Sequence, residues 1–183
     1  MAGMKWAALA AMIATAAATA APAWAEMQLS APGLTAEGVW GDAQVMDGFG
    51  CAGGNLSPEL AWSGLPEGTA TLAVTIHDPD APTGSGWWHW GVYNLPATVA
   101  GLGEGASSAG LPEGALQGQS DFGTHSYGGA CPPEGDAAHR YVVTLWALPQ
   151  ALPEDAGTTG AMLGFYLNAM ALEKAEVVAT YGR

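Results

Sequence analysis

The residues best suited to chemistry are histidines and aspartates near the ends of expected strands: His77, His89, His125, His139, Asp78 and Asp80. A carboxylate beside an imidazole favours the charged imidazolium and fixes the orientation of the ring. Such a group could hold a phosphate oxygen, while a second carboxylate could meet an ammonium group. Carboxylates and imidazoles also bind zinc, manganese and iron, so a metal site is the alternative. Against it, no histidine shows a short ligand spacing such as His-x-His.

The segment Asp78-Pro79-Asp80-Ala81-Pro82 carries both aspartates. Its simpler interpretation is a strand end, because proline fixes φ and aspartate forms local turns. The two carboxylates are two residues apart, so they point the same way if the strand continues. Like charges held close together are costly without a cationic partner, and nearby imidazoles would supply one.

The run from Gly128 to Tyr141 is the other dense feature, and it includes Cys131-Pro132-Pro133. It could be only a rigid loop that leads into a core strand. A double proline flanked by glycines also gives a stiff wall that suits a small pocket. The sequence has no Gly-x-Ser-x-Gly, His-Glu-x-x-His, Cys-x-x-Cys or phosphate-binding Walker motif. These observations favour a binding protein over an enzyme, with no cofactor implied.

The elements that must position these groups are short strands separated by turns rich in glycine and proline, with strands expected over 69–76, 87–95 and 139–148. This rhythm indicates a mainly β chain folded as an antiparallel β-sandwich. In strand 69–76 apolar residues alternate with smaller or polar ones, which predicts one face in the core.

Side-chain alternation refines the pocket. On the strand 139–148, His139 and Tyr141 point one way and Arg140 points the other, so Arg140 is not expected to share a pocket wall with His139. On the strand 87–95, the same rule places His89 on the face that carries Trp87 and Tyr93, with Trp88 and Trp90 on the opposite face.

One C-terminal helix is expected, with few short helices elsewhere. It begins at Thr158 or Thr159, because threonine is a good N-cap, and ends at about Lys174. Its expected apolar face, which we interpret as core packing, consists of Met162, Phe165, Tyr166, Ala169 and Met170. Residues 176–181 follow as a last short strand or an extended tail.

The N-terminus has the pattern of a secretory signal peptide. Lys5 precedes an alanine-rich apolar stretch, and an Ala-x-Ala type cleavage site ends at Ala25. A membrane anchor is the alternative, but it would need about 20 strongly hydrophobic residues. Cleavage of residues 1–25 leaves 183 − 25 = 158 residues, 26–183, which is one ordinary domain. We therefore expect a periplasmic or secreted protein without a transmembrane anchor.

The chain is strongly acidic, with four lysines and arginines against 17 aspartates and glutamates and a net charge of −13. Loss of Lys5 with the signal peptide makes the charge −13 − 1 = −14. Such a chain lacks the excess of basic residues that nucleic-acid binding requires, and it is repelled by anionic membranes. An anionic ligand must therefore be held by local donors.

Cys51 and Cys131 are the only cysteines. In an oxidising compartment a pair favours a disulfide, and two small buried hydrophobic side chains are the alternative.

Several motifs, taken in chain order, resemble the phosphatidylethanolamine-binding protein family, and most closely its bacterial Raf-kinase-inhibitor-like branch. They are Asp78-Pro79-Asp80-Ala81-Pro82, Trp88-His89-Trp90, Cys131-Pro132-Pro133, His139-Arg140-Tyr141 and supporting pieces across residues 46–183. The resemblance implies an antiparallel β-sandwich with a small anion pocket at one end. The positions that match its pocket motifs are Asp78, Asp80, His89, Pro132, Pro133, His139 and Tyr141.

The same resemblance makes Arg140 a structural partner of acidic loops and leaves His77 and His125 outside the pocket. It also makes a homodimer one expectation, because members of this branch often dimerise. One departure is Asn168-Ala169-Met170, where bacterial relatives often carry histidine in the C-terminal helix.

Three functional hypotheses follow. The first is an exported non-enzymatic protein that binds phosphate or a phospholipid head group such as phosphoethanolamine and modulates a partner protein. The second is a protein-interaction or inhibitor module that acts through the same pocket. The third is a metal-assisted hydrolase that uses the Asp/His cluster. Kinase inhibition belongs to eukaryotic relatives, and extending it to this chain would rest on fold analogy alone.

Overall fold

The computed structural model describes residues 26–35 and 37–183, so the expected signal peptide lies outside the described residues. The strands are β1 (Gln28–Ser30), β2 (Asp47–Gly48), β3 (Cys51–Ala52), β4 (Leu60–Ser63), β5 (Thr71–Asp78), β6 (Trp87–Pro96), β7 (Gly101–Leu102), β8 (Leu116–Gln117), β9 (His139–Leu148) and β10 (Glu173–Tyr181). The helical elements are η1 (Asp42–Gln44), α1 (Ala106–Ala109), η2 (Glu154–Gly157) and α2 (Gly160–Met170). None of these helices is long and apolar enough to cross a membrane. The expected mainly β fold is confirmed.

A five-stranded antiparallel sheet of order β10-β9-β5-β6-β8 forms the middle layer of the molecule. The three strands expected from the sequence correspond to β5, β6 and β9, with β9 spanning the expected range in full. Residues 176–181, expected as a strand or a tail, belong to the longer strand β10, which pairs with β9 along its whole length. The strands that carry the candidate site residues are therefore neighbours in one sheet.

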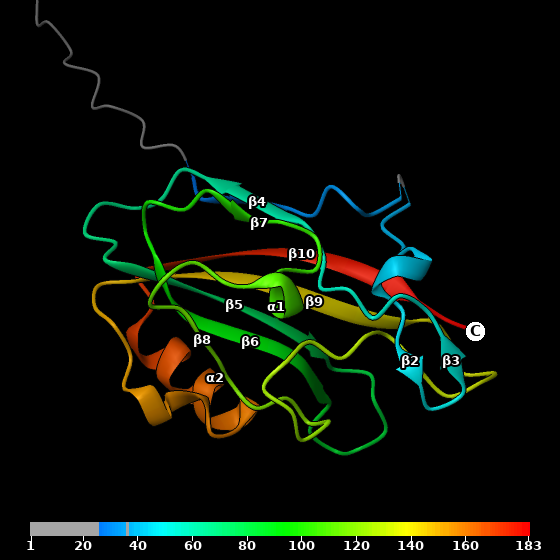
Figure 1. Ribbon diagram of the computed structural model, residues 1–183. Coiled ribbons are helices and arrows are strands. Elements are labelled where there is room, and N and C mark those ends of the chain that lie inside the picture. Colours follow the sequence, from blue (N-terminus) through cyan, green and yellow to red (C-terminus); the bar gives the residue numbers. More distant parts are fainter. Residues whose placement is uncertain (1–25, 36) are drawn as a thin grey trace, which may run out of the picture.

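A smaller sheet of order β1-β4-β7 covers one face of the large sheet and completes the sandwich (Figure 1). The core between the two sheets includes Trp62 from the small sheet and Val74, Trp90 and Leu145 from the large one. Each of these side chains is less than 9% exposed, so the two sheets share one hydrophobic core.

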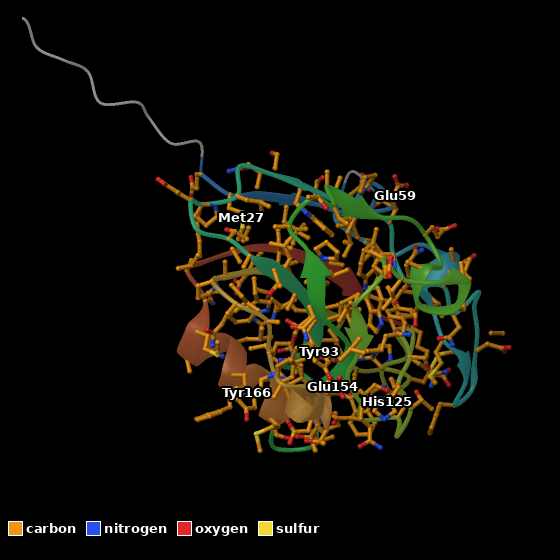
Figure 2. All side chains as sticks on the ribbon, turned by 60° about the vertical axis from the view of Figure 1, so that its left-hand side comes forward. Met27, Glu59, Tyr93, His125, Glu154 and Tyr166 are labelled. Atoms are coloured by element: carbon orange, nitrogen blue, oxygen red, sulfur yellow. A yellow bond between two sulfur atoms is a disulfide. The ribbon has the colours of Figure 1, made fainter. Side chains whose placement is uncertain are left out.

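Helix α2 covers the opposite face of the large sheet, below it in Figure 1. Leu163 and Leu167 of the helix pack with Ala73 and Trp146 of the sheet in a second core. The expectation that strand 69–76 has only one face in the core was therefore wrong, because α2 buries the other face too. Figure 2 shows Tyr93 and Glu154 on this side, where the Tyr93 hydroxyl donates a hydrogen bond to the Glu154 carbonyl oxygen.

The helix begins as expected but packs through a different face. Thr159 is the N-cap, and its hydroxyl oxygen accepts a hydrogen bond of 3.0 Å from the Met162 N–H. The helix ends at Met170, earlier than expected, because the chain turns into β10. The predicted apolar face was right only in part. Tyr166 and Met170 are half-buried against the second core, whereas Met162 and Phe165 are 45% and 68% exposed. The buried apolar side chains of the helix are Leu163 and Leu167.

Strand β6 carries two irregularities that break simple alternation. Trp90 pairs with Ile76 and Trp88 pairs with His77, so His89 is an extra residue in β6. The second shift lies between Val92 and Leu95, beyond Tyr93. Trp87 lines the cavity with His89, as expected. From Trp90 to Tyr93 the alternation is regular, with Trp90 in the core between the sheets and Tyr93 on the α2 side. The prediction that Tyr93 shares a face with His89 was wrong, because the extra residue His89 resets the alternation.

A disulfide joins Cys51 in β3 to Cys131, with the Cα atoms 6.0 Å apart, which confirms the expected pair. It ties the short β2–β3 hairpin to the loop that carries Pro132 and Pro133. In Figure 1 this hairpin lies at the same end of the molecule as the C-terminus.

Candidate ligand-binding site

A cavity of about 200 Å³ opens near the point where β5 ends and β9 begins. The residues that line it come from the β2–β3 hairpin, the strand ends and the Pro132-Pro133 loop: Met46, Phe49, Asp78, Ala81, Pro82, Thr83, Trp87, His89, Phe122, Cys131, Pro132, Pro133, His139 and Tyr141. Six of the seven residues matched to pocket motifs are in this lining, and Asp80 is the exception.

Asp78 and His139 form a buried pair in the cavity wall. Nδ1 of His139 lies 2.7 Å from Oδ2 of Asp78, and the two side chains are only 6% and 4% exposed. The other carboxylate oxygen accepts hydrogen bonds from the N–H groups of Asp80 and Ala81, at 2.8 and 3.1 Å. Three donors therefore satisfy the Asp78 carboxylate and hold the imidazole in one orientation.

His89 is buried beside this pair. Its Nδ1 lies 2.8 Å from the carbonyl oxygen of Gly128, so Nδ1 carries the proton and donates. The ring packs edge-on against Tyr141, with the two ring centroids 5.0 Å apart. Burial lowers the pKa of His89 below its ordinary value, because the charged imidazolium loses its hydration. At neutral pH the ring is uncharged, and its Nε2 is a hydrogen-bond acceptor.

The two imidazoles share one arrangement: each is held through Nδ1, and Nε2 makes no hydrogen bond to any described residue. The Nε2 atom of His139 lies 3.8 Å from a carboxylate oxygen of exposed Asp136, which is beyond hydrogen-bond distance. Both Nε2 atoms are therefore left for a ligand.

Asp80 does not join this group, although the sequence placed it in the pocket. Strand β5 ends at Asp78, so the alternation that would align the two carboxylates does not continue. Instead, Asp80 binds the exposed Arg140 guanidinium through two bonds of 2.7 and 2.9 Å and also accepts from the Arg140 N–H. The expected separation of Arg140 from His139 holds, and Arg140 is the partner of an acidic loop.

Tyr141, Pro132 and Pro133 all lie where the motifs placed them, in the cavity lining. The Tyr141 side chain is 1% exposed, and its hydroxyl has no hydrogen-bond partner among the described residues. Burial raises the pKa of Tyr141 well above its ordinary value, so this hydroxyl stays protonated. Pro132 is buried and Pro133 exposed, and together they form a wall without N–H donors.

The other two histidines lie outside the cavity, as the motifs indicated. His77 points to the α2 side of the sheet and stacks on Trp88 with the ring centroids 4.4 Å apart. His125, labelled in Figure 2, is exposed and binds the carbonyl oxygen of Gln117.

Sequence reasoning placed Trp87 on the face of His89 but missed the rest of the aromatic and apolar border of the cavity: Met46, Phe49 and Phe122. These three residues come from two separate segments, and no periodicity links them. The local signals were Gly48 and Gly50 on either side of Phe49, and the neighbouring Cys51 whose disulfide fixes the hairpin. In the part of the chain that the structure describes, no three His, Cys, Asp or Glu side chains are grouped so that they could hold a metal ion.

The family model described as phosphatidylethanolamine-binding protein matches residues 37–182, which include every strand of the large sheet and the whole cavity lining. The chain belongs to this family. Within the phosphatidylethanolamine-binding protein family, it is similar to two curated Escherichia coli (strain K12) proteins. It is 52% identical to the UPF0098 protein YbcL over 146 residues, covering 76% of this chain and 78% of YbcL. It is 46% identical to the UPF0098 protein YbhB, covering 75% of this chain and 88% of YbhB.

Solved structures of the phosphatidylethanolamine-binding protein family give the same fold. The crystal structure of E. coli YbcL aligns with a TM-score of 0.83 and 48% identity, covering 87% of this chain and 99% of YbcL. The homologue CT736 from Chlamydia trachomatis aligns with a TM-score of 0.72 and 30% identity, covering 86% of this chain and 98% of CT736. The sandwich of this chain is therefore the fold of the family.

Proposed function

We propose that this chain is a non-enzymatic binding protein whose cavity takes a small anion, phosphate or the phosphoryl head group of a phospholipid such as phosphoethanolamine. The observation that carries the proposal is the pair of buried imidazoles, His89 and His139, each held through Nδ1 with Nε2 left for a ligand. The family name points in the same direction, since phosphatidylethanolamine carries a phosphoryl group.

The electrostatics of the cavity support an anion despite the acidity of the chain. Among the described residues Asp78 is the one acidic residue in the lining, and three hydrogen-bond donors compensate its charge. The carboxylate of Asp136, 3.8 Å from Nε2 of His139, is 49% exposed and screened by water. Asp80, which would add a second negative charge, is turned outward and paired with Arg140. An anion in the cavity therefore meets imidazoles and the Tyr141 side chain, with one carboxylate that is already paired.

The lowered pKa of His89 sets the direction of the pH dependence. The ring is neutral at pH 7, and a bound anion favours its protonated form, so binding takes up a proton. The charged and titratable groups around it are Asp78, His77 and Tyr141, of which only Asp78 is an anion. Affinity for sulfate, which does not itself titrate in this range, should rise as pH falls from about 8 to about 5.

The direct test is calorimetric titration of inorganic phosphate into the protein and into His89→Ala and His125→Ala. We expect saturable binding that weakens about tenfold or more in His89→Ala, because that variant lacks one Nε2. His125→Ala is the matched control, because His125 is exposed outside the cavity. Circular dichroism checks that both variants are folded. The absence of saturation by phosphate, phosphoethanolamine or sulfate would overturn the proposal.

We also propose that the chain is exported to the periplasm or secreted, with residues 1–25 removed. The N-terminal pattern supports this, and so does the disulfide, because such bonds persist mainly in oxidising compartments. Mass spectrometry of protein recovered from the periplasm or the medium should give a chain that begins at Glu26. A chain recovered from the cytoplasm with Met1 intact would contradict export.

A further inference from the structure

The mouth of the cavity is bordered by a continuous row of aromatic rings. The Phe49 and Phe122 ring centroids are 5.9 Å apart, and Phe122 lies 5.4 Å from Trp87 and 5.4 Å from His89. The row therefore runs from the exposed Phe49 at the surface to the buried imidazole at the base. We propose that the site selects an anion attached to an aromatic ring, of the aryl phosphomonoester class, with Phe49 as the specificity-determining residue. This inference rests on the proposed anion site.

Phe49 is held in place although its side chain is 77% exposed. It lies at the turn between β2 and β3 with a positive φ of 52°, a conformation that few residues with a side chain adopt. The turn is fastened on both sides: the disulfide ties Cys51 to Cys131, and the Arg183 guanidinium donates to the carbonyl oxygens of Gly50 and Pro132. A large apolar side chain is thus fixed at the mouth of a cavity, where a ligand could cover it.

Phe122 is fixed by a different contact. Its ring packs so closely on Gly128 that a Cβ atom at that position would overlap it. The carbonyl of Gly128 is the group that holds His89, so one backbone segment positions both a ring of the row and an imidazole of the base. The apolar border and the anion-binding base therefore have a fixed relative geometry.

The size of the cavity fits more than a phosphate group. A dry protein cavity of about 150 Å³ admits benzene, and this cavity measures about 200 Å³. Stacked or edge-on aromatic contacts add to the gain from apolar burial. A phosphomonoester of a phenol places its charge at the imidazoles and its ring against Phe122 and Phe49.

The same lining offers an ammonium-bearing head group fewer binding partners. Its favourable partner would be a carboxylate, but Asp78 already accepts three hydrogen bonds and Asp80 lies outside. The remaining partners are the solvated Asp136 carboxylate, 49% exposed, and a cation–π contact with the aromatic rings. Phosphoethanolamine is therefore the compound whose affinity should be compared with that of an aryl phosphate.

The test compares inorganic phosphate, phosphoethanolamine and phenyl phosphate by calorimetry on the whole mature protein. We expect phenyl phosphate to bind about tenfold more tightly than inorganic phosphate. In Phe49→Ala the ratio of these two affinities should fall toward one, and in Phe49→Leu, which keeps an apolar side chain, it should fall less. Phe165→Ala is the matched control, because Phe165 is 68% exposed on α2, outside the cavity lining.

The outcomes separate this inference from the proposed function. If inorganic phosphate binds but phenyl phosphate binds no more tightly, or phosphoethanolamine binds more tightly than phenyl phosphate, only the aryl preference is overturned. If Phe49→Ala and Phe49→Leu both keep the full ratio, the role of Phe49 is overturned. If none of the three compounds binds, both the anion site and this inference fail.

Discussion

Asp78 and Asp80, which are two residues apart, each pair with a basic side chain, but one pair is buried and the other is exposed. Asp78 pairs with His139 inside the cavity wall, where the two side chains are 4% and 6% exposed. Asp80 pairs with Arg140 on the surface, where the side chains are 31% and 58% exposed. The pairs join the last residue of β5 and the turn that follows it to the first two residues of β9. His139 and Arg140, which are adjacent in β9, therefore form one buried pair and one exposed pair.

The difference lies in what surrounds each pair. Because His139 and Arg140 are adjacent in β9, their side chains leave opposite faces of the strand. The inward pair loses its hydration, and the three hydrogen bonds on Asp78 compensate for that loss. The outward pair stays in water, where ion pairs contribute little, and it fastens a turn. Of these two aspartates, only Asp78 therefore lines the cavity.

Removal of the buried carboxylate should have the largest effect. Asp78→Ala leaves two backbone N–H groups and the His139 ring without their acceptor in a buried setting. We expect the free energy of unfolding to fall by about 3 to 5 kcal/mol, measured by urea denaturation at neutral pH. A loss under about 1 kcal/mol would mean that the pair contributes no more than a surface ion pair does.

His139 and Arg140 should contribute very differently to the affinity for phosphate. His139→Ala removes an Nε2 from the cavity, whereas Arg140→Ala removes a guanidinium that lies outside the cavity lining. We expect phosphate affinity to fall about tenfold or more in His139→Ala and to change less than about twofold in Arg140→Ala. Equal losses in the two variants would show that the outer cation contributes as much as the imidazole, which would contradict this prediction.

Removal of the surface charge should be a smaller perturbation. Asp80→Asn keeps an oxygen that can accept from the Arg140 N–H but loses the ionic bonds to the guanidinium. We expect Tm to fall by no more than about 4 °C, with the difference from wild type shrinking in molar salt. A larger shift that salt does not affect would place Asp80 among the structural determinants of the fold.

Much of this contrast could be read from the sequence. The period of two in β9 separated His139 and Tyr141 from Arg140, and the structure confirms this because alternation depends only on local backbone geometry. The resemblance to family motifs placed His89, Pro132 and Pro133 in the pocket, and all three line the same cavity. That they bind a ligand stays a prediction.

The failures have a common cause in tertiary structure. Asp80 was placed in the pocket by the family motif and by an alternation that required the strand to continue, but β5 ends at Asp78. Tyr93 was put on the wrong face because a bulge in β6 cannot be seen in residue types. Helix α2 packs through Leu163 and Leu167. Gly160 and Gly164 of the helix leave room for the Trp88 ring of β6. This packing depends on the position of the helix on the sheet, which residue spacing alone does not give.

The smallest expected effect is the pH dependence of the ion pair between Asp80 and Arg140. The hydrogen bond from the Arg140 side chain lowers the pKa of Asp80 from 3.8 to about 2. Because the pKa of Asp80 is lower in the folded state, the stabilisation by the pair is present above about pH 4 and is lost as pH falls through about 2.

Acid titration followed by NMR should therefore give the Asp80 carboxyl of the wild type a pKa of about 2. In Arg140→Ala the pKa should return only part of the way to 3.8, because the N–H of residue 140 still donates to Asp80. A wild-type value near 3.8 would show that the surface pair does not persist in solution, which would leave only the inner pair as a fixed contact between β5 and β9.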